Sequence, residues 1–153
     1  MKGLSRATTA ANFISQATSG EIKQPKKTNT NLSNVRFTDT QWKLIDKVLE
    51  LSNIRTKTAL FSTIAEFMRL DFNYLDYMDY LDFITGIDVN GVGKAYPIRK
   101  NRAYDFFYEL YEYYRENWVN IRIRGVIVLG ILHYAKNKLN LNLNEFLQEI
   151  SNN

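Results

Sequence analysis

Two short segments of the chain alternate polar and apolar residues, a pattern typical of a half-buried β-strand. One covers residues 34–38, which read Asn-Val-Arg-Phe-Thr, and the other covers residues 120–124, which read Asn-Ile-Arg-Ile-Arg. Successive side chains of a strand point to opposite faces of a sheet. The alternation therefore predicts two strands that place their apolar residues against the core and their Asn and Arg residues on an outward face.

Apolar residues at near-helical spacing follow the first segment and predict two helices. Thr38 or Thr40 is placed to cap the first helix, and Thr56 or Thr58 is placed to cap the second. A hydroxyl at such a position accepts a hydrogen bond from a free backbone N–H of the first turn. Residues 32–70 are therefore predicted to form a strand–helix–helix unit.

The same order of elements returns near the C-terminus. At an offset of 86 residues, residues 34–37 align with residues 120–123, with Asn on Asn and Arg on Arg. A helix that is apolar on one side follows this second segment, and a short helix over residues 144–151 closes the chain. We interpret the pattern as an internal repeat in which residues 119–153 form a second strand–helix–helix unit.

Residues 71–118 lie between the two copies and are predicted to form a helical insert. Tyrosines and aspartates recur at three-residue steps over residues 71–84 and predict a first helix. An aromatic-rich stretch from about residue 101 to residue 117 predicts a second one. The glycines and the proline between these stretches indicate a loop.

The first 31 residues differ in composition from the rest. Residues 1–31 are rich in Ser, Thr, Asn, Gln and Lys and show little periodicity, which predicts a flexible basic tail. Such a tail either keeps the protein in solution or gains order as an arm on DNA. Residues 32–153 are expected to form a single α+β domain that is mostly helical.

Composition narrows the chemistry that the chain can perform. The absence of cysteine and the presence of one histidine exclude disulfides, thiolate zinc sites and multi-histidine metal sites. We interpret Asp76, Asp79 and Asp82 as a solvated stripe on one helix rather than as catalytic carboxylates, and His133 as structural. We therefore expect no enzymatic activity, no metal and no cofactor. No apolar run approaches the length of a membrane span, so we expect a soluble, cytoplasmic protein.

Positive charge gathers at the two ends of the chain. The net charge is +4, and residues 1–38 hold six basic groups against one acid while residues 119–153 hold four against two. A polyanionic partner such as nucleic acid would be attracted to both regions.

The stretch from Val35-Arg36-Phe37-Thr38 through the two helices resembles the ribbon-helix-helix family of Arc- and MetJ-type DNA-binding proteins. Members of that family pair two strands antiparallel and interlock four helices, normally as a dimer. Two copies in one chain resemble a single-chain tandem form, a kind that includes an accessory factor of T-DNA transfer. The resemblance implies two units that share one ribbon within a monomeric pseudo-dimer, in preference to a homodimer. The second copy matches more loosely, because Gly125 and Gly130 are unusual in its first helix.

The resemblance and the alternation together name candidate DNA contacts. Outward-facing Arg suits the acceptor edge of guanine and Asn suits adenine, so the base contacts are predicted to be Asn34, Arg36, Asn120, Arg122 and Arg124. In the family, the N-terminus of the second helix grips phosphate, which implies Thr56, Lys57, Thr58, Asn142 and Asn144, and the tail would add Lys26 and Lys27. Solvated side chains on an exposed hairpin and ordinary helix capping are the alternative interpretations of these residues.

The leading functional expectation is sequence-specific binding of double-stranded DNA without catalysis. By resemblance, the role would be that of an accessory in plasmid conjugation or DNA transfer, with a relaxase or another transfer or replication protein as a further partner. A transcriptional or plasmid copy-number repressor is the first alternative. The second alternative is a protein-interaction module whose acidic, aromatic insert docks a partner. No membrane partner is expected.

Overall fold

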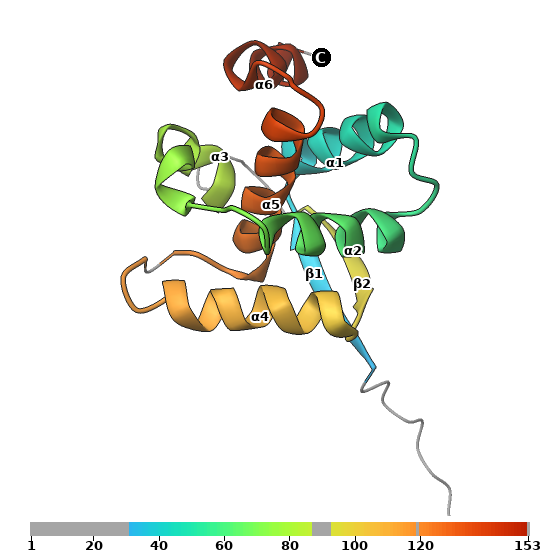
Figure 1. The fold of residues 1–153 in the computed structure, drawn as a ribbon, viewed down its shortest axis with the longest axis vertical. Coiled ribbons are helices and arrows are strands. Elements are labelled where there is room, and N and C mark those ends of the chain that lie inside the picture. The colour runs from blue at the N-terminus through green and yellow to red at the C-terminus, as the bar shows by residue number, and fades with distance from the viewer. Residues whose placement is uncertain (1–30, 87–92, 119, 153) are drawn as a thin grey trace, which may run out of the picture. The chain divides into compact units, whose positions relative to one another are not determined.

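The described part of the chain is an α+β structure that is mostly helical, as the sequence predicted. The computed structural model describes residues 31–86, 93–118 and 120–152, and Leu32–Asn153 form one compact unit. In chain order the elements are β1 (Leu32–Phe37), α1 (Asp39–Ser52), α2 (Lys57–Met68), the 3-10 helix η2 (Tyr74–Tyr80), α3 (Leu81–Thr85), β2 (Lys94–Arg99), α4 (Arg102–Tyr114), α5 (Ile123–Asn137) and α6 (Leu143–Asn152) (Figure 1).

The two strands, β1 and β2, pair antiparallel in a two-stranded sheet. Leu32 lies opposite Arg99 at one end of the ladder, and Phe37 lies opposite Lys94 at the other. Pro97 has no N–H to donate, and a proline is tolerated in a strand that has one unpaired edge. In a two-stranded sheet each strand has such an edge. The insert predicted over residues 71–118 is therefore not wholly helical, because it contains β2.

The second predicted strand, residues 120–124, is wrong. Arg122 occupies the extended position just before α5, and Ile123 is already the first residue of that helix. Ile121 is buried and Arg122 is exposed. An extended residue followed by a first helical turn can alternate in burial as a strand does, and this is the origin of the repeated polar–apolar pattern.

Threonines begin the first two helices, as the sequence predicted. The Thr38 hydroxyl accepts a hydrogen bond from the Gln41 backbone N–H at 3.2 Å, and the Gln41 side chain accepts one from the Thr38 backbone N–H at 3.0 Å. This reciprocal capping box satisfies two backbone donors of α1. The Thr56 hydroxyl accepts from the backbone N–H of Ala59 at 3.1 Å and caps α2.

Helix α5 forms the centre of the core. Every residue from Gly125 to Ala135 is buried, and Figure 1 shows α5 running between α1, α2, α3 and α4. A Cβ atom at Gly130 would lie 2.5 Å from the Ile64 Cγ2 atom and 2.5 Å from the Met68 Sδ atom. The missing side chain therefore lets α2 and α5 approach closely. Among the helices described, none has both the length and the apolar character that crossing a membrane requires.

A buried polar cluster joins η2 to α5. The Tyr77 hydroxyl lies 2.6 Å from His133 Nδ1, and the Asn137 amide donates to the same hydroxyl at 3.2 Å. Burial raises the pKa of Tyr77 to about 12, and burial also lowers the pKa of His133 below its ordinary value of 6.5. Both groups are thus held in their neutral forms. His133 is thus a buried residue that joins α5 to η2.

The His133 cluster predicts an acid-sensitive fold. In the unfolded chain His133 takes up a proton near its ordinary pKa of 6.5, whereas in the folded chain its lowered pKa delays protonation. The contribution of His133 to the free energy of unfolding is therefore fully present above the unfolded-state pKa of 6.5. It decreases as the pH falls below that value, by about 1.4 kcal/mol per unit of pKa difference between the two states. Urea unfolding midpoints near pH 7.5 and near pH 5 measure the effect.

The matched control for this prediction is His133→Gln. Glutamine keeps an acceptor for the Tyr77 hydroxyl and does not titrate, so this variant should lose most of the change in stability between the two pH values. An equal loss in the wild type and in His133→Gln would show that other groups cause the acid sensitivity.

Candidate nucleic-acid interface

One face of the β1–β2 ribbon points away from the core. Val35 and Phe37 are buried, while Asn34 and Arg36 are exposed. The alternation predicted for the first strand is therefore confirmed. Because Asn34 lies opposite Pro97 and Arg36 lies opposite Ala95, each long polar side chain of β1 faces a short, compact one on β2.

The Arg36 guanidinium is held over the end of the ribbon. Its Nη1 atom donates to the backbone carbonyl of Gly93 at 2.6 Å, across the two strands. Gly93 directly precedes β2, and its backbone passes so close to Phe37 that a Cβ atom there would collide with the Phe37 carbonyl. This close approach brings the two strand ends together and leaves the remaining nitrogens of Arg36 toward solvent.

Two more arginines reach β1 from the N-terminus of α5. Arg122 is the residue before the helix and is exposed. The Arg124 guanidinium donates to the Arg36 carbonyl at 3.2 Å and to the Thr85 carbonyl at 2.9 Å. Burial lowers the pKa of Arg124, and the neighbouring charge of Arg122 adds to this. The Nε atom of Arg124 is buried and has no hydrogen-bond partner among the described residues.

The three arginines line one hollow of about 590 Å³ beside β1. The other polar residues of its wall are Ser33, Asn34 and Tyr111, and the described residues that line it include no carboxylate. A guanidinium cluster with free N–H donors at a helix N-terminus is suited to anions, because the helix dipole and the arginine charges act in the same direction.

Part of the segment predicted as a strand at 120–124 thus lies beside β1, but not as a paired strand. Residues 34–36 and 122–124 lie side by side, but α5 brings the second group there and β2 supplies the strand. Asn120 is an exposed turn residue that does not line the hollow. Arg124 is tied to backbone carbonyls, so it positions the hollow more than it presents a free guanidinium.

The N-terminus of α2 lies against the other strand. The Lys57 ammonium is 5.5 Å from the ring centroid of Trp42 and 6.0 Å from that of Tyr96, a β2 residue. The Trp42 indole N–H donates to the Lys94 carbonyl at 2.9 Å, and Thr58 lines a small hollow with Tyr96. The predicted group Thr56, Lys57 and Thr58 is therefore placed beside β2, as Arg122 is placed beside β1.

Two predicted phosphate contacts lie elsewhere. Asn142 accepts from the backbone N–H of Glu145 at 3.1 Å and caps α6, and Asn144 accepts from the Tyr80 hydroxyl at 2.9 Å. Figure 1 shows α6 beyond the end of α5 that is remote from the ribbon. The structure therefore does not gather Asn142 and Asn144 with the arginines. Lys26 and Lys27 lie outside the described residues.

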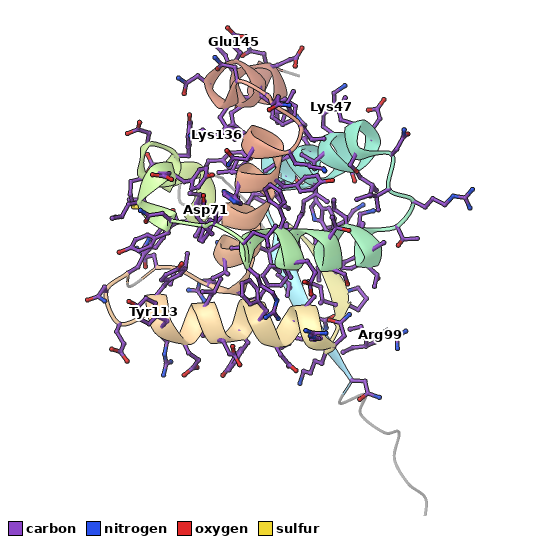
Figure 2. All side chains as sticks on the ribbon, in the orientation of Figure 1. Lys47, Asp71, Arg99, Tyr113, Lys136 and Glu145 are labelled. Atoms are coloured by element: carbon purple, nitrogen blue, oxygen red, sulfur yellow. The ribbon has the colours of Figure 1, made fainter. Side chains whose placement is uncertain are left out.

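The sequence interpretation missed the contribution of β2. Strand β2, with the sequence Lys-Ala-Tyr-Pro-Ile-Arg, has Tyr96 and Ile98 on its core side and Arg99 at an exposed position. The alternation of Tyr96 and Ile98 with other residues indicated a strand here. The glycines before it and Pro97 are typical of a loop, and the segment was therefore predicted to be a loop. Figure 2 shows Arg99 at the end of the ribbon.

Comparison with known proteins does not add a family to this geometry. No family model, no curated protein and no solved structure matches the chain. Within the described residues, no group of three or more His, Cys, Asp or Glu side chains could hold a metal ion.

Proposed function

We propose that the chain binds double-stranded DNA by inserting the outward face of the β1–β2 ribbon into the major groove. The observation that carries the proposal is the convergence of Arg36, Arg122 and Arg124 at one edge of an exposed two-stranded ribbon. A ribbon of this width fits the major groove, where the four base pairs present distinct donor and acceptor patterns.

The base contacts would come from the outward row of the ribbon. Asn34 and Arg36 project from β1 over the compact Pro97 and Ala95, so base edges can approach them. Arg36 suits the two acceptors of guanine and Asn34 suits the donor–acceptor pair of adenine. Arg99, exposed at the opposite end of β2, extends the row. Each well-aligned bidentate pair discriminates against the wrong base by about 1–3 kcal/mol.

The phosphate contacts would come from the two helix N-termini that flank the ribbon. Helix α2 begins beside β2 at Lys57, and α5 begins beside β1 at Arg122. Free backbone N–H groups at a helix start, together with the helix dipole, bind phosphate and fix the register of the protein on the duplex. Arg122 is therefore assigned to phosphate rather than to a base.

The order of the elements supports a single-chain ribbon-helix-helix arrangement. A strand followed by two helices occurs as β1, α1, α2 and again as β2, α4, α5. Under this reading the second copy begins at Lys94 rather than at residue 119, and η2 and α3 connect the copies while α6 is an addition. The two glycines that fitted poorly in a first helix then belong to a second helix, where Gly130 permits the close packing of α2 against α5.

Binding to duplex DNA at increasing salt tests the proposal. We expect binding near 50 mM salt and a plot of log affinity against log salt with a slope of about −3 or steeper, since each neutralised phosphate contributes about −0.9. Fluorescence anisotropy with a labelled pool of random duplexes, followed by selection of the tightest sequences, measures both affinity and preference. A protein that binds no duplex at low salt would contradict the proposal.

The process served by this binding rests on the family resemblance. We propose an accessory role in plasmid conjugation or DNA transfer, with a relaxase or another transfer protein beside it on the DNA. Duplex fragments recovered from the host DNA would lie at a transfer origin in that case. Recovery of promoter or replication-control fragments instead would indicate a repressor.

A further inference from the structure

The elements that follow β1 and those that follow β2 correspond in order and in position. Helices α1 and α4 begin 63 residues apart, and so do their capping residues Thr38 and Asn101. The Thr38 hydroxyl accepts from the backbone N–H of Gln41 at 3.2 Å, and the Asn101 side chain accepts from that of Tyr104 at 3.0 Å. A single offset therefore relates the two junctions between strand and helix, down to the capping bond.

Two contacts join residues that are counterparts of each other. At the offset of 63, the counterpart of Asn34 is Pro97, and these two residues lie opposite each other in the ribbon. The capping positions of α2 and α5 are 66 residues apart, and at that offset the counterpart of Ile64 is Gly130, where α2 and α5 approach closely. A residue that lies against its own counterpart is on a twofold axis. Both contacts therefore support one approximate twofold axis through the ribbon and the crossing of α2 and α5.

The outward row of the ribbon keeps this symmetry at its arginines and breaks it at its centre. Arg36 and its counterpart Arg99 are both exposed, and so are Asn34 and its counterpart Pro97. The Asn34 amide can donate and accept hydrogen bonds, whereas the Pro97 ring has neither a donor nor an acceptor. The two edges of the ribbon therefore offer the same guanidinium group and different central side chains.

The helix starts beside the ribbon differ in the same direction. At the start of α2, the Lys57 ammonium lies 3.8 Å from an Asp46 carboxylate oxygen, and the Thr56 hydroxyl already accepts a backbone N–H of the first turn. At the start of α5, Arg122 forms no ion pair with a described residue, and its side chain provides no cap. The α5 start lies beside β1, the strand of Asn34. The β1 edge therefore holds both the central amide and the less compensated positive charge.

We propose that the chain recognises a duplex site that is not a palindrome and binds it in one preferred orientation. The β1 edge reads guanine and adenine through Arg36 and Asn34 and grips phosphate at Arg122. The β2 edge reads guanine through Arg99, and the apolar Pro97 suits a thymine methyl group. Rotation of the protein by half a turn exchanges these unlike contacts, so one orientation is favoured. The inference rests on the proposed DNA binding and adds the symmetry and the direction of the target.

Selection from random duplexes with the full chain tests the symmetry of the target. We expect the tightest duplexes to share a sequence that differs from its own inverted repeat at the central positions. Pro97→Asn gives the β2 edge the same amide as the β1 edge, so this variant should select adenine at the second central position as well. A shared wild-type sequence that is a perfect palindrome, or the absence of any shared sequence, would overturn the proposal.

Tethered cleavage measures the orientation directly. The chain has no cysteine, so one introduced cysteine can carry an iron–EDTA group that cuts the DNA near it. Arg55→Cys places the group near the start of α2, and Asn120→Cys places it near the start of α5. We expect each variant to cut one flank of the selected site at least about fivefold more than the other flank, which is the lower limit for one base contact. The two variants should cut opposite flanks, and the control Lys47→Cys should cut neither.

The outcomes of the cleavage experiment separate this inference from the proposed function. Equal cleavage of both flanks by each variant would overturn the inference, because the chain would then bind in two orientations. That result would leave the proposed function intact, since the duplex is bound in either case. A chain that binds no duplex would give no cleavage with any variant, and this result would overturn the proposed function together with the inference that rests on it.

Discussion

The Arg36→Ala/Arg122→Ala double variant is expected to lose about 100-fold or more of its affinity for the selected duplex while keeping its fold. Arg36 stands on the outward face of β1 and Arg122 stands at the start of α5, and both are exposed. The variant removes one base contact and one phosphate contact. Loss of the base contact alone weakens the free energy of DNA binding by about 1–3 kcal/mol. Exposed substitutions of this kind change the free energy of unfolding by about 0.5 kcal/mol or less.

The single variants should separate the two kinds of contact. Arg36→Ala is expected to relax the preference for one base pair, whereas Arg122→Ala should weaken binding to all duplexes alike and reduce the salt slope by about one. Arg36→Lys keeps the charge and loses the planar pair of donors, so it should resemble Arg36→Ala in sequence preference. A set of duplexes with single base-pair changes, titrated by anisotropy, gives these differences.

Lys47→Ala is the matched control for charge. Lys47 is an exposed residue of α1 whose ion pair with Glu50 is also exposed, and Figure 2 shows it away from the ribbon end marked by Arg99. This variant should bind DNA about as the wild type does. An Arg36→Ala/Arg122→Ala protein that binds as tightly as Lys47→Ala would exclude the ribbon as the DNA-binding surface.

Local chemistry explains which elements the sequence could predict. The alternation around Val35 and Phe37 needs only the pleat of one strand, and the capping by Thr38 and Thr56 needs only the first turn of each helix. These signals lie within a few residues of the elements that they announce. The first strand and the two helices after it were therefore predicted correctly.

The partner of β1 could not be predicted in the same way. Strand pairing joins residues about sixty positions apart here, since Arg36 lies opposite Ala95. Pro97 and the glycines near it are typical of a loop, and nothing local marks Gly93 as a point of close approach to Phe37. The arginine-rich alternation at residues 120–124 was therefore a stronger but misleading candidate.

The three-residue spacing of Tyr and Asp in residues 71–84 was observed correctly, but the type of helix was not predicted correctly. Asp76, Asp79 and Asp82, three residues apart, were interpreted as a solvated stripe on one helix, but in an α-helix a strict three-residue period drifts around the axis. Residues 74–80 instead form the 3-10 helix η2, which is interrupted at Tyr77 by non-helical backbone angles, and Leu81–Thr85 form the α-helix α3. Tyr77 is buried, and Asp76 and Asp79 are exposed. At that kink Tyr77 contacts His133, and the local sequence does not contain this tertiary contact.

Gly130→Leu is expected to destabilise the protein by about 3 kcal/mol, near the upper end of the usual cost of overpacking a core. Even a single Cβ atom at this position would lie 2.5 Å from Ile64 Cγ2 on α2. Leucine is a far better helix former than glycine, by about 1 kcal/mol, so a loss of stability must come from the contact between α2 and α5. The midpoint of urea unfolding, followed by circular dichroism, measures the loss.

A double-mutant cycle isolates that contact. Gly130→Ala places one methyl group against Ile64, a β-branched side chain that is stiff at Cβ, and Met68 can move its flexible end away. In an Ile64→Ala background the obstructing methyl is gone, so Gly130→Ala should cost about 1 kcal/mol less than it does in the wild type. If the cost is the same in both backgrounds, α2 and α5 do not meet at Gly130 as closely as the packing of the core requires. The close crossing of α2 and α5 would then not be what holds the two helices that flank the ribbon in place.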